Sequence, residues 1–177
     1  MLETGMLLDS TRLIIGFIIL AYASYTDIKT RRASNLLWLI LAITGLILLA
    51  IQYFTIGFEN NYYILFIPIM VGLFFFLFQI GLIFGGADAK ALMAIAILAP
   101  IQPEIGQLPL WNTLMPFSFV IFFNSLLLFL AIPICIFIFN LTRKDIKFPH
   151  SFLGYKMDIK EAKKKFVWPL EIIVEEK

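Results

Sequence analysis

Residues 62–90 read YYILFIPIMVGLFFFLFQIGLIFGGADAK, and this stretch decides the kind of fold that the chain adopts. Its first part, 62–84, passes without a charged side chain. A helix needs about 20 apolar residues to cross a bilayer, so this part is long enough to span. A glycine pair, Asp88 and Lys90 follow directly. The stretch therefore predicts a transmembrane helix that ends beside a carboxylate.

The rest of the chain repeats this apolar character. Four further apolar segments are 13–26, 36–56, 89–101 and 117–141. Charged residues are only 15% of the chain, against about 25% in a typical soluble domain. The second and fifth segments are long enough to span, whereas the first and fourth are short. The first lengthens backwards if Asp9 and Arg12 reach the membrane interface. These features predict an all-α polytopic membrane protein with about five transmembrane helices.

The connections between the segments alternate in charge. Basic residues follow the first, third and fifth segments, whereas Glu59 and Glu104 are the only charges in the other two connections. Of the 14 Lys and Arg residues, only Arg12 falls on the opposite side. The positive-inside rule therefore predicts an outside N-terminus and a cytoplasmic C-terminus. The same assignment brings Asp27 and Asp88 to the cytoplasmic face, where water reaches the ends of short spans.

Two domains follow from this organisation. We expect a transmembrane domain at 1–142 and a short cytoplasmic C-terminal region at 143–177. In that region, Asp158 and Glu161 have the spacing of a capping box, which predicts a helix at 162–166. A strand is expected at 171–174, which makes the tail α/β. The tail is too short for a core of its own.

The two aspartates carry the chemistry of the sequence. A carboxylate costs roughly 3 kcal/mol or more near the bilayer centre, so a chain that keeps two beside its spans is expected to use them. Two carboxylates that share a proton hydrolyse peptides, one as base toward water and one as acid toward the carbonyl oxygen. Structural alternatives exist: Asp27 pairs with Arg31 at the helix end, and Asp88 is the N-cap of a helix that starts at Ala89.

The glycine pair before Asp88 predicts room for an extended substrate. Glycine lets two backbones approach closely and lets a turn take positive φ. The sequence lacks the residues that a zinc-dependent mechanism would need. Cys135 is the only cysteine, and no His-Glu-x-x-His pattern occurs, so we expect no metal and no other cofactor. The basic residues lie where membrane topology requires them, so no nucleic-acid role is expected.

Two motifs resemble those of the type IV prepilin peptidase family. The stretch DIKTRRASN at 27–35 is similar to the family's first-aspartate region, and GGADAK at 85–90 resembles its GxGD motif. Ala at position 87 replaces the second glycine, as in the archaeal branch. The tail stretches at 152–156 and 165–169 are similar to archaeal preflagellin peptidases. The resemblance covers most of the chain.

The resemblance implies a GxGD-type aspartic endopeptidase of the cell membrane, with its active site toward the cytoplasm and with Asp27 and Asp88 as catalytic residues. Four motif residues would support the substrate site: Gly85, Gly86, Ala87 and Lys90. The implied substrates are preflagellin (archaellin) or type IV prepilin-like precursors, which would lose a short basic leader peptide. Family members often carry a sixth span. Bacterial relatives add a paired-Cys zinc loop and a methyltransferase activity, and the single cysteine predicts neither here.

Two other functions stay open at this stage, and the oligomeric state is not predicted. Presenilin and signal-peptide-peptidase proteases also use GxGD but pair it with Pro-Ala-Leu, which this sequence lacks. Cleavage inside a helix rather than at a leader junction would favour that type. A non-enzymatic proton or cation transporter would use the aspartates as ion sites. It requires a polar path, whereas the long segments hold few polar residues, and an ion-flux assay tests it.

Overall fold

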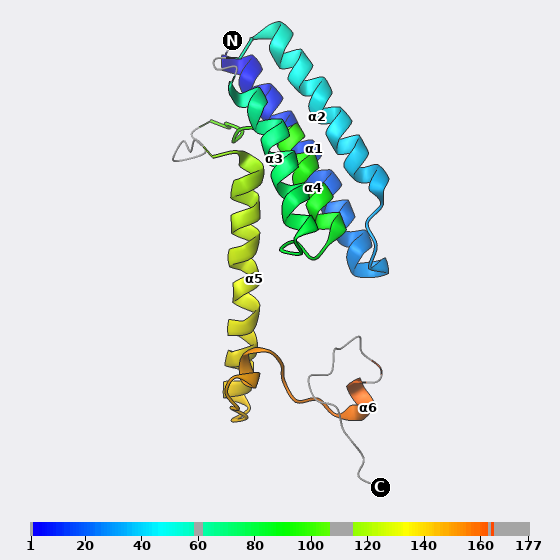
Figure 1. Cartoon of the computed structure of the whole chain (residues 1–177), viewed down its shortest axis with the longest axis vertical. Coiled ribbons are helices and arrows are strands. Elements are labelled where there is room, and N and C mark those ends of the chain that lie inside the picture. The colour runs from blue at the N-terminus through cyan, green and yellow to red at the C-terminus, as the bar shows by residue number, and fades with distance from the viewer. Residues whose placement is uncertain (1, 59–61, 107–114, 163, 165–177) are drawn as a thin grey trace. The chain divides into compact units, whose positions relative to one another are not determined.

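A computed structural model of the chain describes residues 2–58, 62–106, 115–162 and 164. In chain order, its helices are α1 (Leu2–Thr30), α2 (Asn35–Thr55), α3 (Tyr62–Gln79), α4 (Gly86–Leu98), α5 (Phe117–Thr142), the 3-10 helix η1 (His150–Phe152) and α6 (Ile159–Ala162) (Figure 1). The described residues contain no strand, and the all-α prediction is confirmed. The strand expected at 171–174 and most of the helix expected at 162–166 lie outside them. The chain divides into two compact units, Met1–Phe123 and Asn124–Lys177.

Each of the five apolar segments forms a helix, but their lengths differ from expectation. Three helices are long and apolar enough to cross a membrane: Glu3–Thr30, Asn35–Thr55 and Phe117–Thr142. The first segment is thus a long helix that begins well before residue 13. The third is shorter than expected, because α3 ends at Gln79 rather than at residue 84. The sequence therefore predicted helix type correctly, whereas both ends of α1, the end of α3 and both ends of α4 differ from expectation.

Gly81 explains the early end of α3. It has φ of 77°, a left-handed conformation that glycine adopts without steric cost. The N–H of Leu82 donates to the Leu77 carbonyl at 3.0 Å, and the N–H of Gly81 donates to the Phe78 carbonyl at 3.1 Å. These bonds satisfy the last carbonyls of the helix, as in a Schellman-type ending. The apolar residues that follow form a turn, which leads the chain into α4.

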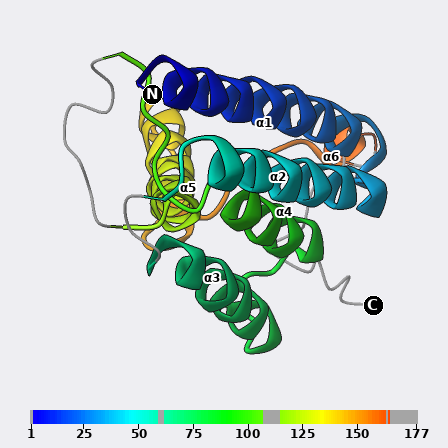
Figure 2. The same cartoon turned by 90° about the horizontal axis from the view of Figure 1, so that it is seen from above.

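Helix α4 is the centre of the first unit. It packs against α2 and α3 and, to a lesser extent, against α1, and it lies between α2 and α3 in Figure 2. One side of α4 joins Trp38 and Leu41 of α2 in a buried cluster, and the other joins Phe74 of α3 in a second cluster. At 13 residues, α4 is roughly 20 Å long, less than the hydrocarbon core of a bilayer. Its neighbours cover most of its surface, so the protein rather than lipid surrounds it.

Helices α2 and α4 approach most closely at Gly45. A Cβ atom on Gly45 would lie 2.6 Å from the Leu98 Cα atom and 2.8 Å from the Leu98 backbone nitrogen. Backbone atoms cannot rotate away as a flexible side chain can. A side chain at this position would therefore force the two helices apart, and the glycine is a packing requirement.

A polar network closes the end of the bundle that contains the start of α1. The Arg12 side chain is only 6% exposed. Its Nη1 donates to Asp9 Oδ1 at 2.9 Å, and its Nη2 donates to Gln52 Oε1 at 2.7 Å. The second Asp9 oxygen accepts the backbone N–H of Glu104 at 3.0 Å. The expectation that Arg12 reaches out to the interface is therefore replaced by a buried Arg12 that pairs with the half-buried Asp9, and together they join α1 to α2 and to the segment after α4.

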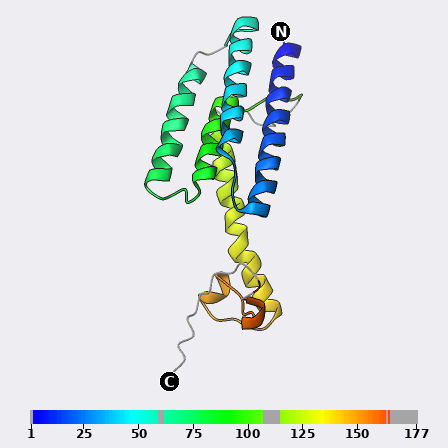
Figure 3. The same ribbon diagram turned by 90° about the vertical axis from the view of Figure 1, so that its right-hand side faces the viewer.

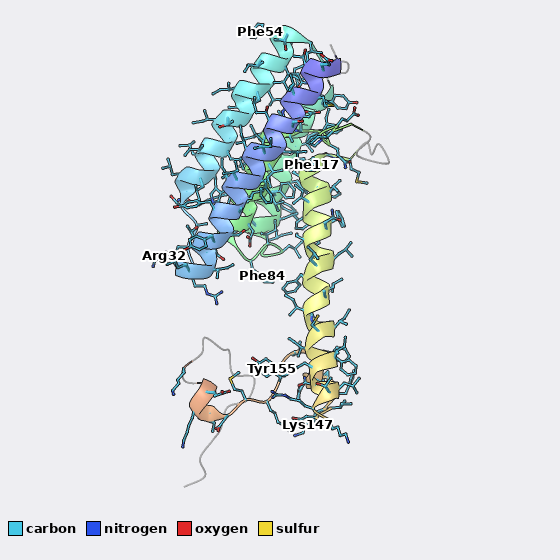
Figure 4. All side chains as sticks on the ribbon, turned by 180° about the vertical axis from the view of Figure 1, so that it is seen from behind. Arg32, Phe54, Phe84, Phe117, Lys147 and Tyr155 are labelled. Atoms are coloured by element: carbon cyan, nitrogen blue, oxygen red, sulfur yellow. The ribbon has the colours of Figure 1, made fainter. Side chains whose placement is uncertain are left out.

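In the second unit, the chain after α5 folds back on the C-terminal half of that helix. Asn140 is buried, and its Nδ2 donates to the carbonyls of Ser151 at 2.8 Å and Gly154 at 2.7 Å. The rings of Phe137 and Phe152 stack with centroids 4.4 Å apart. Figure 4 labels Tyr155 of this segment near the end of α5. One buried amide thus holds the returning chain against the helix.

Candidate active site

Asp27 lies in the last turn of α1, with its side chain exposed. Its carbonyl accepts the backbone N–H of Arg31 at 2.7 Å. Arg31 has φ of 55°, so the chain leaves the helix through a left-handed residue and turns toward α2. The helix end thus presents the carboxylate at the surface, where the turn leads into the next helix.

Asp88 lies in the first turn of α4, with its side chain exposed. The helix begins at Gly86, and its N-cap is Gly85, with φ of −95° and no side-chain cap. The alternative that Asp88 itself caps a helix starting at Ala89 is therefore wrong. A helix that starts three residues earlier leaves the Asp88 carboxylate free of the capping role.

The glycine before Asp88 provides space rather than unusual backbone angles. A Cβ atom on Gly85 would lie 2.9 Å from Asp88 Cγ and would overlap Asp88 Oδ2. The carboxylate therefore folds back over the glycine. The expected positive φ is wrong for both Gly85 and Gly86. A Cβ on Gly86 would meet only the Phe78 ring, at 3.6 Å, so that glycine is not required in the same way.

The two aspartates lie at the same end of the bundle. Arg32, which follows α1, and Phe84, which precedes α4, mark this end in Figure 4, and Phe54 marks the opposite end. Figure 3 shows the turn before α4 at the same level as the connection from α1 to α2. Partial burial raises the pKa of Asp88, and the negative charge of Asp27 raises it further. The structure therefore brings the two charges within electrostatic reach of each other.

A hydrogen bond joins the two aspartate motifs directly. The Lys90 ammonium donates to Asn35 Oδ1 at 2.8 Å, although the residues are 55 positions apart. Asn35 is the first residue of α2, and Ser34 caps that helix by accepting the Leu36 N–H at 3.3 Å. The sequence predicted Lys90 as a site residue, whereas Asn35 is only the last residue of the first motif. No local spacing signals their contact, because it depends on how α2 and α4 pack.

A cavity of about 450 Å³ lies where α1 gives way to α2. Its polar lining includes the side chains of Tyr22, Thr26, Thr30, Ser34 and Asn35, and Arg32 adds a positive charge. Thr26 is the neighbour of Asp27 in the chain, so the cavity opens beside the site. Sequence reasoning missed these hydroxyl residues, although Thr26, Thr30 and Ser34 recur at intervals of four. A larger cavity, of about 480 Å³ in the second unit, is lined by none of the predicted site residues.

The arrangement fits acid–base chemistry by carboxylates. One carboxyl has a pKa raised by burial and by a second carboxylate, which is how proteins divide two acids into a proton donor and a proton acceptor. Both side chains are exposed, so water and an extended chain reach them. Among the residues that the structure describes, no three His, Cys, Asp or Glu side chains gather to hold a metal ion.

Comparisons with known proteins agree with this chemistry. Residues 14–140 match the type IV leader peptidase family. The preflagellin peptidase of Methanococcus voltae is 32% identical over 171 residues, covering 85% of this chain and 69% of the relative. The preflagellin peptidase of Methanocaldococcus jannaschii is 31% identical over 167 residues, covering 86% and 69%. No solved structure gives a significant match. The resemblance found in the two aspartate motifs is confirmed, and the chain belongs to the type IV leader peptidase family.

Proposed function

We propose that this chain is a membrane aspartic endopeptidase that removes the leader peptide from preflagellin or type IV prepilin-like precursors, with Asp27 and Asp88 as its catalytic pair. The observation that carries the catalytic assignment is the position of Asp27, in the last turn of α1, and Asp88, in the first turn of α4, at the same end of the bundle, where the charge of Asp27 adds to the effect of burial on the pKa of Asp88. The family and the relatives' names support the peptidase activity and the substrate class. The precursor's cleaved bond would bind across the exposed end of the bundle.

In the mechanism, Asp88 holds the proton that the pair shares. Its pKa is raised by burial and by Asp27, which favours the protonated form. Asp27 then takes a proton from the attacking water, while Asp88 donates its proton to the carbonyl oxygen of the cleaved bond. Because the charge of Asp27 contributes to the raised pKa of Asp88, a pH–rate profile reports on the pair rather than on Asp88 alone.

The membrane arrangement completes the proposal. The chain crosses the bilayer five times as a multi-pass protein, with its N-terminus outside and the region 143–177 in the cytoplasm. Domain 1–142 then carries the active site at the cytoplasmic face. The charge alternation of the connections supports this orientation. The central place of α4 supports a short fourth crossing, because neighbouring helices cover it.

The test replaces each aspartate by asparagine and measures removal of the leader from a preflagellin precursor in membranes. Asp27→Asn and Asp88→Asn each keep the side-chain shape and lose the proton chemistry, so cleavage should fall by about 100-fold or more. Asp158→Asn, in the second unit, is the matched control and should cleave at the wild-type rate. Substantial cleavage by either site variant would reject the catalytic assignment.

A further inference from the structure

Asp27 has little direct packing against α4, the helix that carries Asp88. Helix α4 packs mainly on α2 and α3, and its contact with α1 is smaller. Asp27 lies near the end of α1, three residues before Thr30. Direct packing between α1 and α4 is therefore limited, and α2, which packs on both helices, connects them. At the end of the bundle that holds the two aspartates, this connection includes the start of α2.

Such a connection is built from side-chain hydrogen bonds. The Thr30 hydroxyl is within 2.8 Å of the Thr26 carbonyl and 3.2 Å of the Arg32 carbonyl, which braces the turn after α1. Ser34 caps α2 one residue before Asn35. Lys90 then joins Asn35 to α4 at 2.8 Å. At this end of the bundle, the path from Asp27 to Asp88 thus includes one braced turn and one hydrogen bond between helices, beside the packing of α2 on α1 and on α4.

Lys90 and Asp88 project from different sides of α4, so an effect of Lys90 on the position of Asp88 is transmitted through the helix. Successive helical residues are 100° apart, so Lys90 and Asp88 project from α4 about 200° apart. The lysine also brings a cation to the N-terminus of α2, where the helix dipole favours an anion. What this position supplies is a long donor that reaches Asn35.

We propose that Lys90 and Asn35 form a positioning pair, whose hydrogen bond sets the separation of Asp27 and Asp88. The proposal rests on the catalytic assignment above and deepens it. Neither residue touches the reacting atoms. Their hydrogen bond fixes the turn after α1 against the first turn of α4, and so keeps the two carboxylates within reach of one water.

The test is a double-mutant cycle on the full chain in liposomes, with kcat and KM measured on a preflagellin precursor. Lys90→Met and Asn35→Leu keep the size of each side chain and remove the hydrogen bond. Each should lower kcat about fivefold and leave KM unchanged. The double variant should be no slower than the slower single variant, because one interaction is lost in all three. Lys90→Arg and Asn35→Asp retain donor and acceptor and should restore most of kcat.

A pH profile separates positioning from a general loss of structure. Asn35→Leu changes no charge, so a shift in its profile reports geometry. If Asp27 moves away, its repulsion no longer raises the pKa of Asp88, and the alkaline limb of kcat moves to lower pH. An unchanged limb would overturn the proposal. A double variant whose kcat falls about 25-fold would also overturn the proposal, because the two losses would then be independent. A rise in KM at constant kcat would overturn it as well.

The same assay keeps this proposal distinct from the catalytic assignment. Asp27→Asn and Asp88→Asn are measured beside the pair. If they still cleave, the catalytic assignment fails whatever the pair does. If they are inactive while Lys90→Met and Asn35→Leu match the wild type, the assignment stands and the positioning pair is rejected.

Discussion

The two ends of helix α1 use the same residue type in opposite ways. Asp9, near the start, accepts a hydrogen bond from Arg12 at 2.9 Å and another from the Glu104 backbone at 3.0 Å. Asp27, near the other end, is exposed, and its charge raises the pKa of Asp88. The two carboxylates are 18 positions apart on one helix, roughly 27 Å. At one end of the bundle, the Asp9 carboxylate thus belongs to a hydrogen-bond network. At the other end, the Asp27 carboxylate is exposed.

The difference lies in what surrounds each carboxylate. A buried cation beside Asp9 makes that carboxylate part of the fold, because removing either partner leaves the other charge uncompensated. A second carboxylate near Asp27 does the reverse, since like charges oppose ionisation and favour a shared proton. The contrast teaches that the closed end stabilises the bundle, whereas the open end, where we propose the catalytic pair, holds two like charges at some cost to stability.

The largest effect is expected at the closed end. Asp9→Leu leaves the buried Arg12 guanidinium without its carboxylate, and this should lower the free energy of unfolding by about 3 kcal/mol. Thermal unfolding in detergent micelles measures the change. Glu3→Gln, an exposed carboxylate on the same helix, is the control and should stay within about 0.5 kcal/mol of the wild type. An Asp9 variant as stable as that control would show that the Asp9 carboxylate does not stabilise the fold.

The middle of the bundle links both ends, so a change there should affect stability and cleavage together. Gly45→Ala puts a Cβ atom 2.6 Å from Leu98 Cα and separates α2 from α4. We expect a loss of about 2 kcal/mol in unfolding free energy and slower cleavage. Gly72→Ala meets no atom within 4 Å and should be neutral or slightly stabilising. Equal behaviour of the two variants would show that α2 and α4 do not need this close contact.

At the open end, a small change should affect cleavage more than stability. Gly85→Ala places a methyl group against the Asp88 carboxylate, which must rotate away. Displacing this proposed catalytic group should lower kcat about tenfold, while the unfolding temperature changes little. Gly86→Ala meets only the Phe78 ring at 3.6 Å and should retain far more activity. The ratio of kcat for the two alanine variants is the measurement, and a ratio near one would contradict the expected steric effect.

The smallest effect is a gain in stability from removing the carboxylate of Asp88, one of the two proposed catalytic residues. The pKa of Asp88 is raised on folding, so the folded state binds more protons than the unfolded state in the interval above the ordinary carboxyl pKa. Stability from this group is therefore complete at low pH and is lost as pH rises through the folded pKa. Asp88→Asn escapes that loss and should unfold at a slightly higher temperature near neutral pH.

The control for this last prediction is pH itself. Below the ordinary carboxyl pKa, Asp88 is protonated in both states, and the gain should disappear. Unfolding temperatures of the wild type and of Asp88→Asn, measured from acid to neutral pH, give the comparison. A variant that is less stable at neutral pH would mean that the carboxylate serves the fold, as Asp9 does.

Most of the fold was predictable because apolar length is a local property. Runs such as 36–56 and 117–141 match α2 and α5 to within one residue at each end. The end of α3 was not predicted, because the left-handed Gly81 ends the helix inside an apolar run. The start of α4 was also missed. An aspartate in the first turn resembles a cap in sequence, and only backbone angles assign the cap to Gly85.

By itself, the sequence identified the apolar helices and the family, and it predicted the membrane location and the two candidate catalytic aspartates. These follow from composition, from the spacing of apolar runs and from two short motifs, all of which are local. Only the tertiary structure decided which acid is buried with a cation and which is presented beside another acid. Helix packing decided the Lys90–Asn35 contact as well. The physical reason is that pKa, burial and hydrogen bonding depend on neighbours that are distant in the chain.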